Sequence, residues 1–200
     1  MHVMDTEGLE AVSMRRVARE VGVEAMSLYN HVKDKDDLLQ AVCDRVMAGF
    51  EFPEETDDWV ETCKAGARSW RRVLQAHPDM MRLFAETHGP SPSTLDSLKP
   101  TEFALRVLRN GGLSDRDTVQ AFHVFGGFIQ GFVMMENGSI QKSQGERGAF
   151  DMPESEVPDD VFPVLRAVHR HFADCSADEQ FEFGLDLLVR GLRDWAADGS

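Results

Sequence analysis

The stretch VAREVGVEAMSLYNHV, residues 17–32, decides how the N-terminal part of the chain folds. The apolar residues on both sides of Gly22 are expected on the inner faces of two helices, and Ala18 is small enough to lie where these helices touch; the apolar residues are Val17, Val21, Val23 and Leu28. Glycine allows a positive φ in a tight turn, so two short helices can cross steeply there. The pattern predicts a helix-turn-helix, a motif that presents its second helix to the major groove of DNA.

Spacing alone also fits a generic corner between two helices of an all-helical protein, so both interpretations stay open at this point. The residues that follow Gly22 favour the first interpretation. Between Met26 and Lys35, only Leu28 and Val32 are obvious core residues. The remaining side chains are mostly polar, and we expect them to form one presented face.

Charge separates the two parts of the chain, whose formal net charge is −14 over 200 residues. Residues 51–200 hold 15 Lys and Arg against 26 Asp and Glu, which argues against nucleic-acid binding by that part. Residues 14–35 hold five basic against three acidic residues. The N-terminal part is therefore the better candidate for contact with phosphates.

Cysteine usage and hydropathy predict a cytoplasmic protein. The three cysteines are widely spaced and odd in number, which is typical of reduced thiols and not of a disulfide framework. No secretory signal opens the chain, and we expect no apolar run near the roughly 20 residues that span a bilayer. We therefore predict no membrane partner.

Helical periodicity and helix caps occur along the whole chain, and no segment alternates like a strand, so we predict an all-α fold. The polar, proline-containing segment FPEETDD, residues 52–58, marks a break between domains of residues 1–51 and 52–200. The expected helices span residues 14–21, 24–31, 35–50, 58–77, 79–87, 94–110, 115–137, 159–173 and 177–197. Residues 137–159 are expected to form a long loop.

The segment GLEAVSMRRVAREVGVEAMSLYNHVKDKDDLLQAV, residues 8–42, closely resembles the DNA-binding region of the tetracycline-repressor (TetR) family. FEFGLDLLVRGL, residues 181–192, extends a weaker resemblance to the tetracycline-repressor-like C-terminal branch. The resemblance implies a repressor with an N-terminal helix-turn-helix domain and a C-terminal helical domain for ligand binding and dimerisation. The implied partners are palindromic double-stranded operator DNA, a small-molecule effector and a second copy, bound through the Asp115–Asn137 and Ala177–Ala197 helices.

The resemblance also implies a role for each residue of the reading motif. Ser13 and Arg15 would meet phosphate or a base edge. Base contacts, which specify sequence, fall to Glu24, Ala25, Met26 and Asn30. Phosphate contacts, which position the protein, fall to Ser27, Tyr29, His31 and Lys35.

For the effector, the positions that hold drug and magnesium in the tetracycline repressor fall here near residues that are mostly apolar or glycine. We therefore expect a small, largely apolar effector, with no metal and no cofactor. Gly127 replaces the metal-binding histidine, and an aromatic residue is kept at Trp70. The candidate lining, chosen for helix phase and by this resemblance, is Trp70, Leu83, Phe84, Phe103, Leu108, Gly127, Phe128, Gly131 and Met134.

Family members place a full first helix before the motif, whereas only about its last turn, HVMDTEG (residues 2–8), precedes the motif here. We therefore expect the 200-residue chain to bind DNA poorly. An alternative function is that of a helical small-molecule-binding protein without DNA-binding activity. Catalysis has little support, because the sequence shows no nucleophile elbow and no glycine-rich phosphate loop after a strand.

Overall fold

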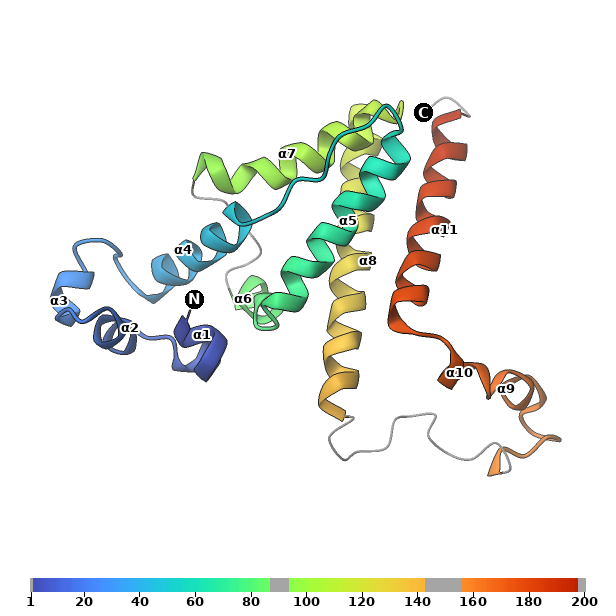
Figure 1. Cartoon of the computed structure of the whole chain (residues 1–200), viewed down its shortest axis with the longest axis horizontal. Coiled ribbons are helices and arrows are strands. Elements are labelled where there is room, and N and C mark those ends of the chain that lie inside the picture. The colour runs from blue at the N-terminus through green and yellow to red at the C-terminus, as the bar shows by residue number, and fades with distance from the viewer. Residues whose placement is uncertain (1, 87–93, 143–155, 198–200) are drawn as a thin grey trace. The chain divides into compact units, whose positions relative to one another are not determined.

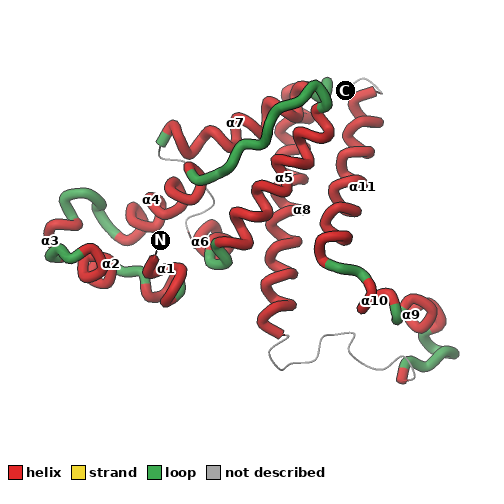
Figure 2. Tube along the Cα trace, in the orientation of Figure 1, coloured by secondary structure: helices red, strands yellow, loops and turns green. Residues whose placement is uncertain are grey.

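The computed structural model describes residues 2–86, 94–142 and 156–197. Within these ranges all regular elements are helices and none is a strand (Figure 2). The predicted all-α class is thus confirmed. Part of the expected loop at 137–159 differs, because residues 137–142 continue a helix and 143–155 lie outside the described residues.

The chain forms two compact units, one ending at Gln130 and the other beginning at Gly131. The division falls inside α8 (Asp115–Lys142), and not at the composition break after residue 51. The reason is packing, because α4 (Lys35–Ala48) lies against α7 (Leu95–Asn110) and joins the N-terminal helices to those that follow (Figure 1). The boundary between residues 51 and 52 stays a prediction about domains.

The N-terminal helices turn where the sequence predicts. α2 (Met14–Val21) begins at Ser13, whose hydroxyl accepts a hydrogen bond from the Arg16 N–H at 3.2 Å. It ends at Gly22, which has a φ of 72°. The Val23 N–H donates to the Ala18 carbonyl at 3.0 Å, closing a Schellman motif that satisfies the last carbonyls of the helix.

α3 is shorter than predicted, spanning Ala25–Leu28. After Ser27 the backbone tightens, since the Asn30 N–H donates three residues back at 3.3 Å and the His31 N–H donates to Leu28 at 2.9 Å. The residues up to His31 therefore form a turn that prolongs α3 and not a further helical turn. Asp34 then caps α4 by accepting from the Asp37 N–H at 2.9 Å.

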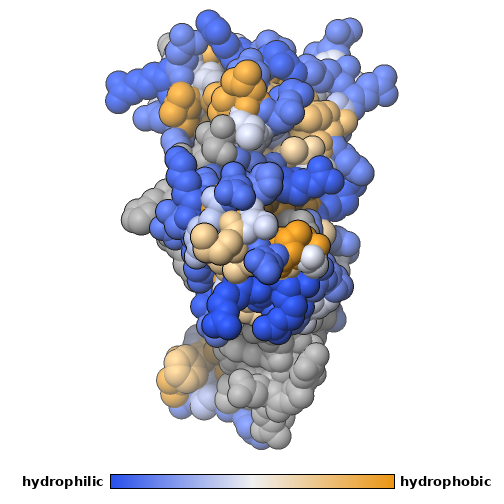
Figure 3. Space-filling model, turned by 90° about the vertical axis from the view of Figure 1, so that its left-hand side faces the viewer, coloured by the Kyte–Doolittle hydropathy of each residue, from blue (hydrophilic) through white to orange (hydrophobic). Residues whose placement is uncertain are grey.

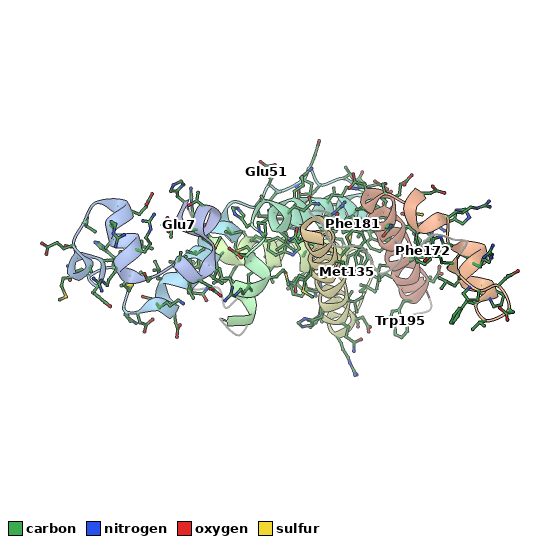
Figure 4. The ribbon with its side chains drawn as sticks, turned by 90° about the horizontal axis from the view of Figure 1, so that it is seen from below. Glu7, Glu51, Met135, Phe172, Phe181 and Trp195 are labelled. Atoms are coloured by element: carbon green, nitrogen blue, oxygen red, sulfur yellow. The ribbon has the colours of Figure 1, made fainter. Side chains whose placement is uncertain are left out.

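An ion pair between Glu7 and Arg16 joins α1 (His2–Glu7) to α2. The Arg16 guanidinium donates to Glu7 of α1 and to Glu20 of its own helix, the latter at 2.8 Å. Glu7 is labelled in Figure 4. Hydrogen bonding to Arg16 holds the pKa of Glu7 below its ordinary value, so the ion pair persists at neutral pH.

The rest of the first unit packs around α5 (Trp59–Ala76), α6 (Met80–Glu86) and α7. Phe103 of α7 lies so close to α5 that a Cβ on Gly66 would stand 2.9 Å from its Cε1 atom. Only a glycine at position 66 leaves room for this ring. Gly127 of α8 is the opposite case, because an added Cβ would meet no atom within 4 Å.

The second unit contains the end of α8 and three further helices, α9 (Pro163–Val168), α10 (His171–Asp174) and α11 (Ala177–Ala197). The predicted helix over 159–173 is therefore two short helices. Phe181 of α11 is fully buried, and its ring meets Phe132 of α8 edge-on at 5.3 Å (Figure 4). Phe181, Leu185 and Val189 recur every four residues, which places them on one buried face of α11.

One expectation about hydropathy is wrong. The segment Asp115–Asn137 is long and apolar enough, by length and composition, to cross a membrane. Its phenylalanines, valines and methionines keep the mean hydropathy high although glutamines and His123 interrupt the apolar run. The core helix of a soluble protein passes the same test, and Ala121, Phe125 and Ile129 are buried in the first unit.

Gly66 and Gly127, two of the helical glycines of the first unit, should respond oppositely to replacement by alanine. Gly127→Ala should raise the free energy of unfolding by up to about 1 kcal/mol, since alanine favours the helix and the site is open. Gly66→Ala gains the same propensity but must displace the buried Phe103 ring, and overpacking costs about 1–3 kcal/mol. Urea unfolding at matched protein concentration should therefore rank Gly66→Ala below Gly127→Ala, and equal stabilities would contradict the packing described.

Candidate functional site

Two surfaces of the first unit carry functional chemistry, and the first is the helix-turn-helix. The residues predicted to contact DNA are accessible: nine of the ten are exposed and Ala25 is half-buried, so a partner can reach them all. Met26 is 73% exposed and Tyr29 50% exposed, which is unusual for large side chains without a partner. The motif thus presents both apolar and hydrogen-bonding groups outward.

Only some of the basic side chains on this surface are available to bind phosphate. Arg16 is bound by two carboxylates, so it serves the fold and not a phosphate. Arg15 and Lys35 are exposed and form no ion pair within the ranges that the structure describes. These two side chains can meet phosphates without breaking an existing contact.

Two valines expected on the inner faces of the motif are outside instead. Val21 is 59% exposed and Val23 is 44% exposed, because both flank the turn at Gly22 on the surface. Leu28 and Val32 are half-buried, which fits their expected role as anchors only in part. Figure 3 views this end of the chain and shows a largely hydrophilic face with small hydrophobic patches.

The second surface is a cavity of about 760 Å³ between α4, α5, α7 and the first half of α8. Its size is within the range of small-molecule sites, about 300–1,000 Å³. The wall is mostly apolar and aromatic. It is lined by Met47, Phe50, Cys63, Gly66, Ala67, Trp70, Leu98, Pro100, Thr101, Phe103, Ala104, Val107, Leu108, Phe122, His123, Phe125, Gly126, Gly127, Ile129 and Gln130.

Four of the nine residues predicted to bind the effector line this cavity, namely Trp70, Phe103, Leu108 and Gly127. Leu83 and Phe84 are buried behind the wall, and the Phe84 ring stacks on Trp70 with centroids 6.4 Å apart. Phe128, Gly131 and Met134 are not in the wall. Successive residues of an α-helix are rotated by about 100° around its axis. Phe128 therefore lies on a different face of α8 from Gly127.

Residues not predicted from the sequence complete the wall. Met47 lies in the last turn of α4, the helix that directly follows the reading motif, and Phe50 lies just beyond the end of this helix. No sequence signal links them to α7, because that contact joins segments about fifty residues apart. On α8 the helical periodicity could have predicted two further wall residues. His123 and Gln130 lie four residues before and three residues after Gly127, so they share its face of the helix.

Among the residues that the structure describes, no Asp, Glu, Lys or Arg lines the cavity. Burial raises the pKa of the Cys63 thiol to about 12, so this group is protonated and uncharged at neutral pH. Thr101, His123 and Gln130 supply polar atoms, and their side chains have no hydrogen-bond partner among the residues that the structure describes. In the same part of the chain no three His, Cys, Asp or Glu side chains gather to hold a metal ion.

Side-chain contacts connect the cavity to the N-terminal helices. Trp70 in the wall stacks on Phe84 of α6. At the start of α6, the Asp79 carboxylate accepts a hydrogen bond from the Leu9 N–H at 3.0 Å. Arg82 of α6 also pairs with Glu10 at 2.7 Å, next to the short 3-10 helix η1 (Leu9–Ala11) that precedes α2.

Comparison with known proteins agrees with this architecture. Residues 1–42 match the family described as bacterial regulatory proteins of the tetR family, and residues 52–195 match the tetracyclin repressor-like C-terminal domain. The class A tetracycline repressor protein from transposon 1721 of Escherichia coli is 30% identical over 96% of this chain and 86% of its own length.

Solved structures give the same result. Apo ActR from Streptomyces coelicolor superposes with a TM-score of 0.84 at 29% identity, covering 100% of this chain and 93% of ActR. ActR in complex with actinorhodin superposes with a TM-score of 0.80 at 31% identity, covering 100% and 94%. Family models together cover most of the sequence. The chain therefore belongs to the TetR family of bacterial regulatory proteins, which are DNA-binding transcriptional regulators and not enzymes.

Proposed function

We propose that the chain is a homodimeric, cytoplasmic repressor that leaves its operator when a small, largely apolar molecule occupies the cavity. The observation that carries the proposal is the position of α4. This helix directly follows the reading motif, and Met47 in its last turn and Phe50 just beyond its end form part of the cavity wall. A molecule in the cavity therefore touches the same helix that sets the position of the motif.

DNA reading is assigned to the exposed face of the motif. Asn30 can donate and accept at a base edge, and Met26 and Ala25 can pack on thymine methyl groups. Arg15 and Lys35, which are free of ion pairs among the described residues, supply charge for phosphates. Residues 51–200 carry a net negative charge, which favours the motif as the surface that binds DNA.

The effector releases the protein from the operator because the first unit has two arrangements, and the effector and the operator each bind a different one more tightly. An effector that contacts Phe50 and Trp70 better when α4 and α6 have shifted favours that arrangement. α6 transmits the shift to η1 through Asp79 and Arg82. Operator DNA selects the other arrangement, so each ligand lowers the affinity for the other.

The effector inferred here differs from a metal-chelated drug. The cavity offers no carboxylate and no group of metal-ligating side chains among the described residues. ActR was solved in complex with actinorhodin, and its similarity to this chain supports an organic effector. The aromatic wall favours a ring-containing molecule.

Dimerisation is assigned to α8 and α11. In the second unit, large apolar side chains of these helices are exposed to solvent. An exposed apolar patch of this kind typically marks a surface that a protein partner covers. The exposed residues are Met134, Met135, Phe183, Leu187 and Trp195. Leu185 and Val189 of α11 are buried within their own unit, so they are not part of this exposed surface.

A first prediction concerns the reading face. An operator is selected from random duplex DNA, and binding is measured by fluorescence anisotropy at several salt concentrations. Asn30→Ala should weaken operator binding by about 1–3 kcal/mol per base contact and relax the preference at one base pair. Lys35→Ala should weaken all sequences alike and lower the salt slope by about one per subunit.

Lys99→Ala is the matched control, since it removes an exposed lysine that pairs with Asp96 on α7. It should leave operator affinity and salt slope unchanged. If Lys99→Ala lost as much operator affinity as Lys35→Ala, the assignment of DNA binding to the exposed face of the motif would be wrong. The same titration measures the absolute affinity, and complete absence of specific binding would favour a small-molecule-binding protein without DNA-binding activity.

A second prediction concerns the dimer. Leu187→Glu places a charge on the exposed face of α11 and should yield folded monomers with much weaker operator binding. Leu95→Glu makes the same change at an 84% exposed leucine of α7 and should leave the dimer intact. Sedimentation velocity with circular dichroism distinguishes the two, and a dimeric Leu187→Glu variant would refute the assigned interface.

A further inference from the structure

The wall that α8 gives to the cavity has a distinctive order of residues. His123, Gly126, Gly127 and Gln130 all line the cavity. They stand at positions i, i+3, i+4 and i+7, so they share one face of the helix. A polar side chain therefore lies at each end of this face, and two glycines lie between them.

The middle of this face is a flat floor. An added Cβ at Gly126 or at Gly127 would meet no atom within 4 Å, so the space above both glycines is open. On this face of α8 no side chain stands between His123 and Gln130, whereas Phe122, Phe125 and Ile129 line the cavity from the adjacent face of the same helix. A flat molecule can therefore approach the helix backbone over one full turn.

The ends of the floor offer hydrogen bonds. His123 and Gln130 are seven residues apart, which corresponds to about 10 Å along a helix axis. Neither side chain has a hydrogen-bond partner among the described residues, although the His123 ring meets Phe122 edge-on at 5.6 Å. These groups are available to a ligand with polar atoms at both of its ends.

Aromatic rings from other helices complete the cavity. The Phe103 ring is buried against Gly66, and its centroid lies 6.1 Å from that of Phe50. Trp70 adds a third ring, 6.4 Å from Phe50. Such rings favour offset or edge-on contacts with another aromatic ring system.

We propose that the cavity takes an uncharged, planar molecule of about three fused aromatic rings with a hydrogen-bonding group at each end. The rings lie over Gly126 and Gly127, and the end groups reach His123 and Gln130. A charged ligand is disfavoured because none of the described residues that line the cavity is an Asp, Glu, Lys or Arg that could balance its charge. The role of this molecule as effector rests on the proposed function, whereas its fit to the cavity does not.

The test measures direct binding to the full chain without DNA, by calorimetry. The probe is 2,6-diaminoanthraquinone, an uncharged three-ring molecule with an amino group at each end. Saturable binding is expected. Anthraquinone-2,6-disulfonate has the same rings but two negative charges, and it should bind at least about tenfold more weakly because no Lys or Arg among the described lining residues can balance these charges.

Variants locate the probe. Gln130→Leu should weaken the diamine by up to about tenfold and unsubstituted anthraquinone hardly at all, as expected for one lost hydrogen bond. Gly127→Leu fills the space above the floor. It should weaken the binding of both the diamine and unsubstituted anthraquinone by more than Gln130→Leu does. Gly131→Leu is the control, one turn further along α8 and outside the cavity wall, and should bind both as the unaltered chain does.

Circular dichroism on each variant confirms that a loss of binding is not a loss of fold. No saturable binding of the diamine, equal affinity for the disulfonate, or unchanged affinity in a folded Gly127→Leu variant would each overturn the inferred ligand class. Because DNA is absent from every measurement, those results do not depend on whether the chain is a repressor. A failure to bind operator would appear only in the DNA titration.

Discussion

The contact of Phe50 with Phe103 and Trp70 is the interaction on which the functional account depends. Phe50 lies just beyond α4, is 7% exposed, and packs its ring about 6 Å from each of the other two centroids. The three rings come from the end of the DNA-reading segment, from α5 and from α7. Since packed interiors transmit displacements and do not absorb them, any molecule that enters between these rings acts on the position of α4.

A second connection starts at the same cavity. Trp70 stacks on Phe84, and α6 in turn holds the segment before α2 through the Leu9 N–H to Asp79 hydrogen bond and the Glu10–Arg82 ion pair. The exposed ion pair contributes little energy by itself, whereas the amide–carboxylate bond fixes the backbone of η1 directly. α4 and α6 therefore link the cavity to both ends of the reading motif, and both belong to one compact unit. This arrangement explains how a largely apolar cavity can control a polar surface.

Local signals predicted much of the fold, and long-range contacts explain the rest. Gly22, Ser13 and Asp34 act through their own turns, so the sequence predicts the helix ends that they form. The cavity is different, because Met47 and Phe50 reach it only through the packing of α4 on α7, which no local pattern specifies. Leu83 has the right hydrophobicity and helix phase for a wall residue, yet α6 places it fully inside the core. Val21 and Val23 show the reverse, since apolar character alone did not bury residues that flank a surface turn.

The central claim is that cavity occupancy and operator binding oppose each other through α4 and α6. The most direct measurement is the operator dissociation constant, determined by fluorescence anisotropy with and without saturating 2,6-diaminoanthraquinone. The coupling typical of such switches predicts a loss of operator affinity of roughly 5–150-fold, and linkage requires an equal loss of diamine affinity on the operator complex. An operator affinity that stays the same while the cavity is demonstrably filled would contradict the account.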